Sequence, residues 1–519
     1  MFTIDLGTSG PKVAIFTVDG HFVDGEFEPV DLLLFPGGGV EQRPDDWWRG
    51  IIVGAQRLMD RSPVPVDSIV AVSVTAQWSG TVPTARDGEA VYNAVIWMDS
   101  RGAKQIEGVV GGRIKVAGYD VRKLRRWLVL TGGAPAHSGK DPLAHILWLE
   151  EERPDAARAT DKYLEPKDWL NLRLTGRCVG TYDSMVLHWV TDNRDPNRIC
   201  YDEGLLRVSG LDRSKLPDMV RAIDVIGTLL PQVAEELGLR PETVVIGGTG
   251  DLQSAAVGSG AVGDFEGHLY CGTSSWLSCH VPYKKTDVLH GVASLPSPLP
   301  GKYYVADEQE VAGGCLSWLS DKIIFADDGL TGPPPKDVFH RLDALAETLA
   351  PGSDGVIFTP WLNGERTPVD DHTLRSGWHN QSLGTTRTHL VRSVLEGVAF
   401  NSRWLLGAVE KFTGKRFPAL NFIGGGASSR TWAQIMADVL DRPIRQVENP
   451  IRANARGAAL LAGVALERIT VDDITRSVTV TETIDPDPAN RLVYDELYRE
   501  FRNLYRRTKG VYRRLNRQH

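Results

Sequence analysis

The sequence predicts a two-domain α/β protein whose two halves are built on the same plan. Its 519 residues are too many for one compact core, so two domains of ordinary size are expected. A strand–turn–strand unit with a Gly-Thr-Ser turn occurs at the start of the chain and again near its middle. Around these units, apolar stretches of helical period alternate with short β-branched runs, which is the pattern of a mixed α/β fold.

The duplicated unit is predicted to be a β-hairpin in each half of the chain. In the first copy, strands over 2–6 and 12–17 flank the turn at residues 7–10. In the second copy, strands over 268–271 and 276–281 flank the turn at residues 272–275. Each turn would present backbone N–H groups and hydroxyls at the tip of its hairpin.

The remaining elements follow from apolar periodicity and from glycine positions. Helices are predicted over 45–60, 144–152, 168–174, 388–409 and 429–440, and strands over 68–75, 244–246, 356–358 and 420–423. Small residues near 260–267 mark the domain boundary, so we expect domains over 1–262 and 263–466 and a helical tail over 467–519.

The tail carries an apolar stripe with arginines between its members. Tyr494, Leu497, Phe501 and Tyr505 recur at i, i+3/i+4 spacing. A nucleic-acid-binding helix would also show interleaved aromatic and basic residues. We favour an amphipathic helix packed on the body, because stripes of this period usually face a core.

Composition narrows the classes of partner and compartment. The formal net charge of -8 argues against nucleic acid as a partner. Five cysteines without a CxxC pair indicate reduced thiols, and no targeting segment or bilayer-length apolar run is present. The 12 histidines lack metal-ligand spacing, so a zinc site is not expected. We therefore expect a cytoplasmic protein without a membrane partner.

The first hairpin combines the groups that bind phosphate. Its glycine turn, with Gly7, lets the backbone approach an anion, and Thr8, Ser9 and Lys12 can donate hydrogen bonds to it. Asp5, at the end of the preceding strand, suits Mg²⁺, which prefers few carboxylates plus phosphate oxygens. A plain β-turn with a solvated lysine is the alternative. The second turn, with Gly272 and Thr273, favours phosphate binding because two facing loops would form a clamp.

Asp251 ends the glycine-rich run Gly247–Asp251, which follows a predicted strand. Ligands of open α/β sheets bind at the carboxyl ends of strands, and phosphoryl transfer needs a carboxylate to accept the proton of the attacking hydroxyl. The alternative is that Asp251 caps the helix that follows. From this motif alone, capping is the better interpretation.

Three further groups are candidates for ligand contact. Gly425 and Gly426 lie in a strand–Gly₃–helix turn that suits close approach of a nucleotide. Gln77, Trp78 and Ser79 follow a buried strand, and Asp99 and Arg101 combine with Trp97 into a surface for hydroxyl-rich ligands. Structural packing, or an Asp99–Arg101 ion pair, explains the last two groups equally well.

In series, these stretches resemble the FGGY family of carbohydrate kinases, in its xylulokinase-like branch. The resembling segments are IDLGTSGPKVAIF, VTAQWSG, VIWMDSRG, KDPLAHILWL, LEPKDWLNLRLTG, GGTGDLQSAAVGSG, YCGTSSW, WLNGERTP, LVRSVLEGVAFNSRWLL and FIGGGASSRTWAQIMADVL. They cover nearly the whole chain in the family's order, which makes the series far more specific than any one motif.

The resemblance implies two ribonuclease-H-like domains of the actin-like, sugar kinase/Hsp70 type around a central cleft, with sugar bound by the first and ATP by the second. It implies Asp251 as catalytic base, with Asp5 and Asp251 as the candidate Mg²⁺ contacts. The residues implied to surround ATP are Asp5, Gly7, Thr8, Ser9, Lys12, Gly272, Thr273, Gly314, Gly425 and Gly426. Those implied to face the sugar are Gln77, Trp78, Ser79, Asp99 and Arg101.

Departures from the family pattern leave the acceptor open. Xylulokinases usually carry Met-His where this chain has Trp78-Ser79, and Asp-Asn where it has Asp251-Leu252. Changed hydrogen-bonding groups alter substrate discrimination strongly. D-xylulose or a related ketose is the first candidate, and glycerol, erythritol, gluconate or ribulose are alternatives. A non-kinase ATPase of the actin or Hsp70 kind, a silent sugar sensor, and a homodimer such as family members often form also remain open.

Overall fold

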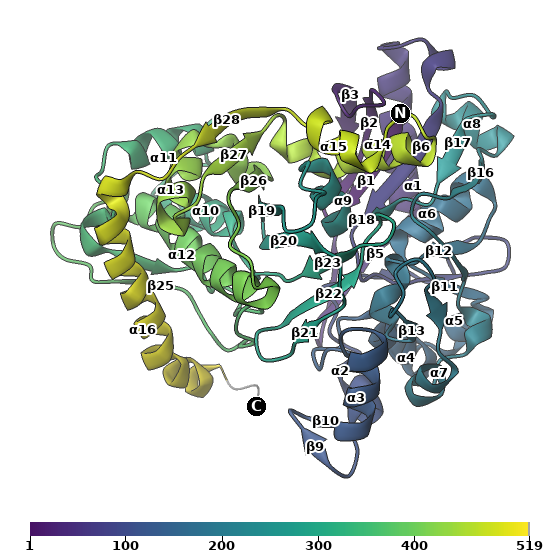
Figure 1. The fold of residues 1–519 in the computed structure, drawn as a ribbon, viewed down its shortest axis with the longest axis horizontal. Helices are drawn as coiled ribbons and strands as arrows, with labels where there is room; N and C mark the ends of the chain where they lie inside the picture. Colours follow the sequence, from purple (N-terminus) through teal and green to yellow (C-terminus); the bar gives the residue numbers. More distant parts are fainter. Residues whose placement is uncertain (517–519) are drawn as a thin grey trace.

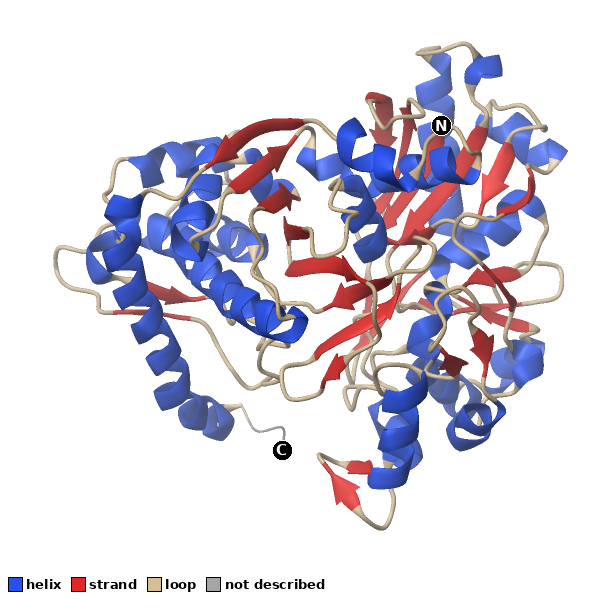
Figure 2. Cartoon of the chain, viewed as in Figure 1, coloured by secondary structure: helices blue, strands red, loops and turns tan. Residues whose placement is uncertain are grey.

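Two β-sheets organise the protein, and a computed structural model describes residues 1–516 of it (Figure 1). The first sheet has seven strands and the second has eight. Each sheet contains one of the predicted hairpins, so the expected duplication is confirmed. In both sheets the first strand of the hairpin also has a parallel neighbour on its other side. Figure 2 shows helices flanking both sheets.

The first sheet has the order β16-β17-β6-β1-β2-β3, and β18 also pairs with β6. Its strands are β1 (Phe2–Gly7), β2 (Gly10–Phe16), β3 (Phe22–Phe27), β6 (Ala71–Ala76), β16 (Val225–Thr228), β17 (Val244–Ile246) and β18 (Thr249–Gly250). The helices of residues 44–258 are α1 (Pro44–Asp60), α2 (Ala103–Val110), α3 (Val121–Leu130), α4 (Pro142–Glu152), α5 (Pro154–Ala159), α6 (Pro166–Thr175), α7 (Glu203–Ser209), α8 (Pro231–Leu237) and α9 (Asp251–Gly258).

The second sheet has the order β21-β22-β23-β20-β19-β26-β27-β28. Its strands are β19 (Gly267–Cys271), β20 (Ser275–Val281), β21 (Thr286–Asp287), β22 (Val292–Pro296), β23 (Tyr303–Ala306), β26 (Leu420–Ile423), β27 (Ile444–Val447) and β28 (Val480–Ile484). The helices of this half are α10 (Gly313–Leu319), α11 (Val338–Glu347), α12 (Arg387–Thr413), α13 (Arg430–Leu440), α14 (Ala453–Ala465), α15 (Val471–Ser477) and α16 (Arg491–Leu515).

Smaller ribbons complete the fold. They are β4 (Leu33–Phe35), β5 (Gly39–Gln42) and β8 (Ala94–Val95) in one three-stranded sheet, and the pairs β7 (Val82–Thr84) with β11 (Lys162–Leu164), β9 (Lys115–Val116) with β10 (Tyr119–Asp120), β12 (Val179–Thr181) with β15 (Asp218–Val220), β13 (Thr191–Asp192) with β14 (Cys200–Tyr201), and β24 (Ile357–Thr359) with β25 (Gly377–His379).

Strand alternation explains why both faces of the first sheet are covered. Phe2, Ile4 and Leu6 of β1 are fully buried and belong to the core that β1 shares with α1 and α6. Ala14 and Phe16 of β2 belong instead to a core that includes α14. Because successive side chains of a strand point to opposite faces, these apolar strands need cover on both sides.

Helices α9 and α14 pack against each other at two glycines (Figure 1). A Cβ placed on Gly258 would lie 1.8 Å from the carbonyl oxygen of Ala453, and one on Gly457 would lie 1.9 Å from that of Ser254. The Ser254 hydroxyl donates to the carbonyl oxygen of Asn454 at 2.7 Å. Helix α14 lies in the chain between β27 and β28 of the second sheet, and through α9 it is fastened to the half that contains the first sheet.

The segment 467–519 is not simply a helical tail, which corrects the expectation from the sequence. Residues 480–484 form β28, an edge strand antiparallel to β27. The β-branched run Val480-Thr-Glu-Thr-Ile484 suits an edge strand, with charged Glu482 facing Arg430. Its five residues are too few to show a clear period in the sequence.

Helix α16 lies along the outside of the second sheet's half of the molecule (Figure 1). Tyr494, Leu497 and Phe501 are buried in the same core as α12 and α13. The ring of Phe501 lies 5.3 Å from that of Trp361 and 5.8 Å from that of Phe400. The apolar stripe thus faces the body, while Arg499, Arg506 and Arg507 are exposed and Arg502 packs over the ring of Trp404.

We expect Phe501→Ala to lower the free energy of unfolding by about 3–5 kcal/mol, because it removes a fully buried ring from a packed aromatic cluster. The measurement is urea unfolding followed by circular dichroism. Leu492→Ala, at an 83% exposed position of the same helix, is the matched control and should change stability by less than about 0.5 kcal/mol. Equal effects of the two substitutions would contradict the packing role of α16.

Candidate active site

Strands β1, β6 and β18 of the first sheet end at the same edge, and two carboxylates, Asp5 and Asp251, lie there. Asp5 in β1 pairs with Thr75 in β6, and Thr75 pairs in turn with Thr249 in β18. Asp251 comes directly after β18 and begins α9. The parallel register of these strands therefore brings Asp5 and Asp251, 246 positions apart in the sequence, to the same edge of the sheet.

The turn before Asp251 is one that only glycine fits. Gly248 has φ +70°, and a Cβ there would lie 2.1 Å from the carbonyl oxygen of Val74. The N-cap of α9 is Gly250, and Asp251 is the first helical residue, accepting a hydrogen bond at Oδ1 from the N–H of Leu252. Asp251 is thus not the capping residue, although one of its oxygens does satisfy a backbone N–H of the first turn.

The electrostatic environment of Asp251 is unusual for a carboxylate. Burial, and after it the charge of Asp5, raises the pKa of Asp251 to about 7, and the charge of Glu308 acts in the same direction. Tyr270 in β19 lies close by: burial, followed by the charges of Asp251 and Asp5, raises the pKa of its hydroxyl. A residue of the second sheet therefore faces the carboxylates of the first.

Asp5 is buried with only part of its hydrogen-bonding capacity used. Its Oδ2 accepts a hydrogen bond from Lys12 Nζ at 3.3 Å, and its Oδ1 is buried without any protein partner. Lys12 is half-exposed on the neighbouring strand β2. Gly7 and Ser9 lie at the tip of the same hairpin, with Ser9 exposed.

The hydroxyl of Thr8 joins the hairpin to the loops that follow β6 and β8. It accepts a hydrogen bond from Trp97 Nε1 at 3.0 Å and donates to Gln77 Oε1 at 3.2 Å. Gln77 Nε2 donates to Gln42 Oε1, and Gln42 Nε2 donates to the carbonyl oxygen of Thr8. The sequence analysis did not single out Gln42, because nothing local distinguishes it.

Trp78 and Ser79 occupy the loop beside the Asp251 turn. The Trp78 ring packs on Gly250, where a Cβ would lie 3.3 Å from it, and its Nε1 is buried without a protein partner. Ser79 has φ +66°, and its hydroxyl donates to the carbonyl oxygen of Lys140 at 2.9 Å. Of these two side chains, Trp78 is the one with an unused buried donor next to the Asp251 turn.

Asp99 and Arg101 form an ion pair, which was one of the two interpretations of that motif. Asp99 is buried, and both its oxygens accept from protein donors: Arg101 to both and the N–H of Val40 to Oδ2. Arg101 also pairs with Glu41 at 2.6 Å and stacks over the ring of Trp148 at 3.8 Å. The pair holds this loop in place.

Three backbone turns of the second half meet at the carboxyl end of β19. The predicted turn at Gly272 and Thr273 accepts hydrogen bonds from residues 312–314, including one from the N–H of Gly314 to the carbonyl oxygen of Thr273 at 3.2 Å. The parallel register of β19 and β26 places the turn with Gly425 and Gly426 beside Cys271. A Cβ on Gly425 would meet no atom within 4 Å, so this turn is open on one side.

A charged cluster faces the same region and was not identified from the sequence. Arg366 pairs with Glu310 at 2.5 Å and with Glu308, and its guanidinium lies 5.7 Å from the ring centroid of Trp97 in the first half. Burial, together with the charge of Arg366, lowers the pKa of Lys140. WLNGERTP was noted as a family landmark, but no role for Arg366 follows from that segment alone.

This chain is similar to known proteins over nearly its whole length. A curated relative, xylulose kinase of Bacillus subtilis (strain 168), is 28% identical over 519 residues, covering 98% of this chain and 97% of the relative. Gluconokinase of the same organism is 24% identical, covering 99% and 97%. A crystal structure of a "xyloylose kinase" from Brucella ovis superposes with a TM-score of 0.83 at 26% identity, covering 98% of this chain and 99% of that one.

The family match spans both halves of the fold. Residues 1–258 match the N-terminal domain of the FGGY family of carbohydrate kinases, and residues 268–466 match its C-terminal domain. The predicted two-domain, actin-like architecture agrees with these matches and with the duplicated hairpins. This chain belongs to the FGGY family of carbohydrate kinases.

Proposed function

We propose that this protein transfers the γ-phosphoryl group of ATP to a terminal hydroxyl of a small sugar or polyol, with Asp251 as the catalytic base. D-xylulose or a related ketose is the first candidate acceptor, since the similar xylulose kinase spans the full chain. An aldonate is the alternative, because a gluconokinase is almost as similar. We place the acceptor on residues 1–262, ATP on residues 263–466 and the protein in the cytoplasm.

The observation that carries this proposal is the environment of Asp251. A general base works best when its pKa lies near the operating pH, and burial beside Asp5 raises that of Asp251 to about 7. The acceptor hydroxyl would donate to the free carboxylate oxygen of Asp251, which takes the proton as the oxygen attacks phosphorus. The proton then rests on a carboxyl that its surroundings already favour in the neutral form.

The phosphates of ATP would lie between the two hairpins. Lys12 and the turn Gly7–Ser9 supply donors from the first sheet, and the turn with Gly272 and Thr273 supplies them from the second. Donors fixed in advance on both sides stabilise the charge that develops on the transferred group. The open turn at Gly425 and Gly426, next to Gly314, suits the nucleoside portion.

The chemistry of Asp5 fits Mg²⁺. Its Oδ1 is a buried acceptor without a protein partner, and Mg²⁺ is commonly held by one or two carboxylates plus phosphate oxygens. Within residues 1–516, no cluster of three or more His, Cys, Asp or Glu side chains is arranged to hold a metal, so the protein would offer Asp5 and Asp251 alone. When bound, Mg²⁺ neutralises part of the phosphate charge.

The sugar would bind against Trp78, near Gln77 and Ser79. The unpaired Nε1 of Trp78 is free to donate to a sugar hydroxyl beside Asp251. Asp99 and Arg101 would act indirectly, because their charges already satisfy each other and Glu41. Contact between Arg366 and Trp97 brings the two halves together over this site, which excludes water from the reacting groups.

The first prediction concerns the stability of the ligand-free protein. The pKa of Asp251 is raised from 3.8 to about 7 by folding, so ionisation of this group costs stability. The stability that protonated Asp251 gives to the folded state is fully present below pH 4 and is lost as the pH rises through about 7. Asp251→Asn should therefore raise the unfolding midpoint at pH 8, and the gain should shrink toward pH 4.

Thermal unfolding from pH 4 to pH 8, without Mg²⁺ or nucleotide, measures this difference. Asp155→Asn, at an exposed position of α5, is the matched control and should show no such trend. A pH-independent difference between wild type and Asp251→Asn would show that the folded-state pKa of Asp251 is ordinary.

The second prediction concerns turnover. Asp251→Asn should lower kcat by about 10²- to 10⁴-fold, because the amide cannot accept the hydroxyl proton. ATP affinity should change little, since the turns proposed to hold the nucleotide are intact and Asp5 remains as the proposed carboxylate contact of Mg²⁺. Steady-state kinetics, with nucleotide binding by calorimetry, test both statements. Turnover within tenfold of wild type would remove Asp251 from the role of base.

The third prediction concerns the acceptor. A coupled ADP-release screen over ketoses, polyols and aldonates should find at least one compound that stimulates ADP release well above the basal rate. The same compound should raise the melting temperature of the protein in the absence of ATP. ADP release that is indifferent to every acceptor would instead favour an ATPase of the actin or Hsp70 kind, and binding without turnover would favour a sugar sensor.

A further inference from the structure

A basic surface cavity lies where α16 crosses α12, away from both hairpins. Its volume is about 390 Å³, within the range of small-molecule sites. The residues that line it are Arg403, Asp495, Tyr498, Arg499, Arg502 and Arg506. All but Arg403 come from one face of α16, where they recur at i, i+3/i+4 spacing, and Arg403 comes from the middle of α12.

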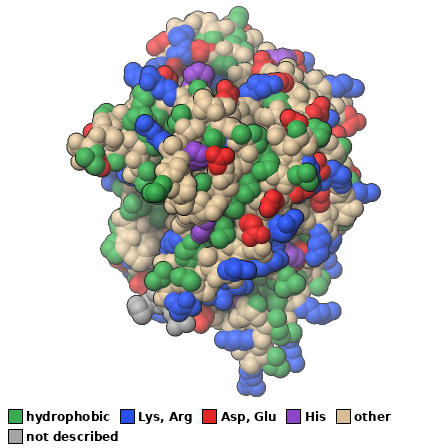
Figure 3. All heavy atoms as spheres, turned by 90° about the vertical axis from the view of Figure 1, so that its left-hand side faces the viewer, with side chains coloured by type: hydrophobic (Ala, Val, Ile, Leu, Met, Phe, Trp, Pro, Cys, Tyr) green, Lys and Arg blue, Asp and Glu red, His purple; other side chains and the backbone are tan. Residues whose placement is uncertain are grey.

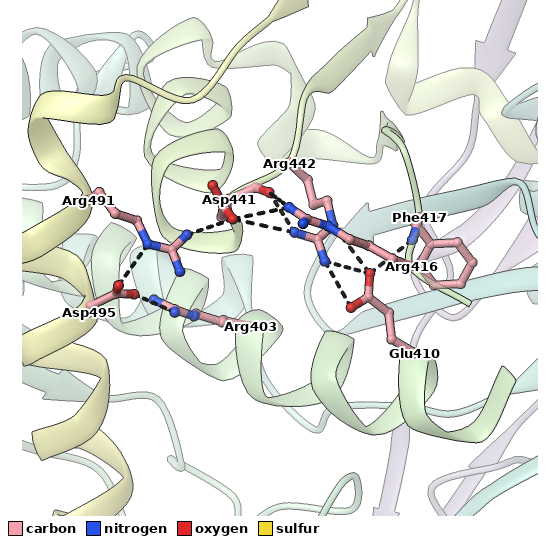
Figure 4. A network of polar contacts seen from close by, with 8 residues as sticks. All are labelled: Arg403, Glu410, Arg416, Phe417, Asp441, Arg442, Arg491 and Asp495. Atoms are coloured by element: carbon pink, nitrogen blue, oxygen red, sulfur yellow. Dashed lines mark hydrogen bonds and ion pairs between the residues drawn. The ribbon is translucent and has the colours of Figure 1, made fainter. Parts of the chain in front are cut away.

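Positive charge dominates this cavity. Four guanidinium groups line it against one carboxylate, and Asp495 is shared, accepting hydrogen bonds from Arg403 at 2.5 Å and from Arg491 at 2.7 Å (Figure 4). Helix α16 carries eight basic and three acidic residues in a chain of net charge -8. On the face that α16 crosses, Lys and Arg side chains are numerous over the lower half (Figure 3). Such a concentration favours an anion.

Two of the arginines are held in place by aromatic rings. The guanidinium of Arg403 lies 4.4 Å from the ring centroid of Tyr498, and that of Arg502 lies 4.2 Å from that of Trp404. Arg502 Nη1 also donates to the hydroxyl of Tyr498 at 3.2 Å. Stacking of this kind fixes the orientation of the guanidinium, so less conformational entropy is lost when a ligand binds.

Both of these arginines also have unused donors. Arg403 Nη1 and Arg502 Nε are buried and have no hydrogen-bond partner among residues 1–516. A buried N–H without a partner is costly, and an oxyanion is the acceptor that guanidinium groups bind best. The cavity therefore combines excess positive charge, fixed geometry and unsatisfied donors.

We propose that this cavity is a second ligand site, which binds a phosphate group carried by a small molecule or present as free phosphate. The anion would accept hydrogen bonds from Arg403 of α12 and from Arg499, Arg502 and Arg506 of α16. By joining the two helices it fastens the end of the chain to the body. No group of the proposed catalytic cleft takes part in it.

Titration calorimetry with inorganic phosphate in a low-salt buffer tests this proposal. The variant Arg499→Gln/Arg506→Gln removes two exposed donors of the cavity, and of these Arg506 makes a long hydrogen bond, 3.4 Å, to Asn503 of the same helix. Arg507→Gln/Arg514→Gln is the control of equal charge on the same helix. We expect the first variant to weaken one phosphate site by at least about tenfold and the control by less than about twofold. Phosphate bound in the catalytic cleft remains in both variants.

A second arm identifies the source of the phosphate group. Ribose 5-phosphate binding more tightly than inorganic phosphate to this site would point to a phosphorylated metabolite, and the reverse order to free phosphate. Equal losses in the two double variants, or equal stabilisation of the wild type by phosphate and by chloride at matched ionic strength, would overturn the proposal. Circular dichroism of each variant verifies that it is folded.

Discussion

The joint between α9 and α14 constrains the rest of the molecule. Helix α9 has Asp251 at its first position and Gly258 at its last, and at that last position it touches the backbone of Ala453 in α14. Neither Gly258 nor Gly457 has room for a Cβ, so the two backbones are in direct contact. Because α9 spans only eight residues, the proposed base stands at one end of a stiff element, about 10 Å along its axis from Gly258. A displacement of α14 would therefore act directly on the helix that begins with Asp251.

Strand register adds the second constraint. Asp5 and Asp251 meet because β1, β6 and β18 are parallel and end together, and Tyr270 faces them from β19. Asp5 is buried and Asp251 is partly buried beside it, and the loss of solvent, followed by the charge of Asp5, raises the pKa of Asp251. The hairpin turns supply donors around the pair, with Lys12 already placed on Asp5. The fold thus stores an unfavourable electrostatic arrangement at the place where phosphate charge is proposed to enter.

Much of the fold could be predicted because its signals are local. The two hairpins, the long helix α12 and the glycine that ends α6 each follow from residues that are neighbours in sequence. The proximity of Asp251 to Asp5 could not be derived from the Gly247–Asp251 run, which by itself indicates a helix cap. It was expected only because the motifs follow one another in the order of the FGGY family. Glu308 and Arg366 were missed because they pair across 58 positions and resemble ordinary surface charges. Strand β28 was missed because five residues are too few for the alternation of an edge strand to be recognised in the sequence.

The ion cluster of Asp99, Arg101 and Glu41 stabilises a loop beside the proposed sugar site, whereas other residues would determine which acceptor binds there. It satisfies its own charges and holds the loop under the proposed sugar site without using a ligand. Trp78 and Leu252, by contrast, lie partly exposed beside Asp251 and are not members of this ion cluster. Substitutions at these two positions can therefore change which acceptor fits while the surrounding loops keep their shape. In such a scaffold we expect a change of acceptor preference to cost less stability than a substitution in the ion cluster would.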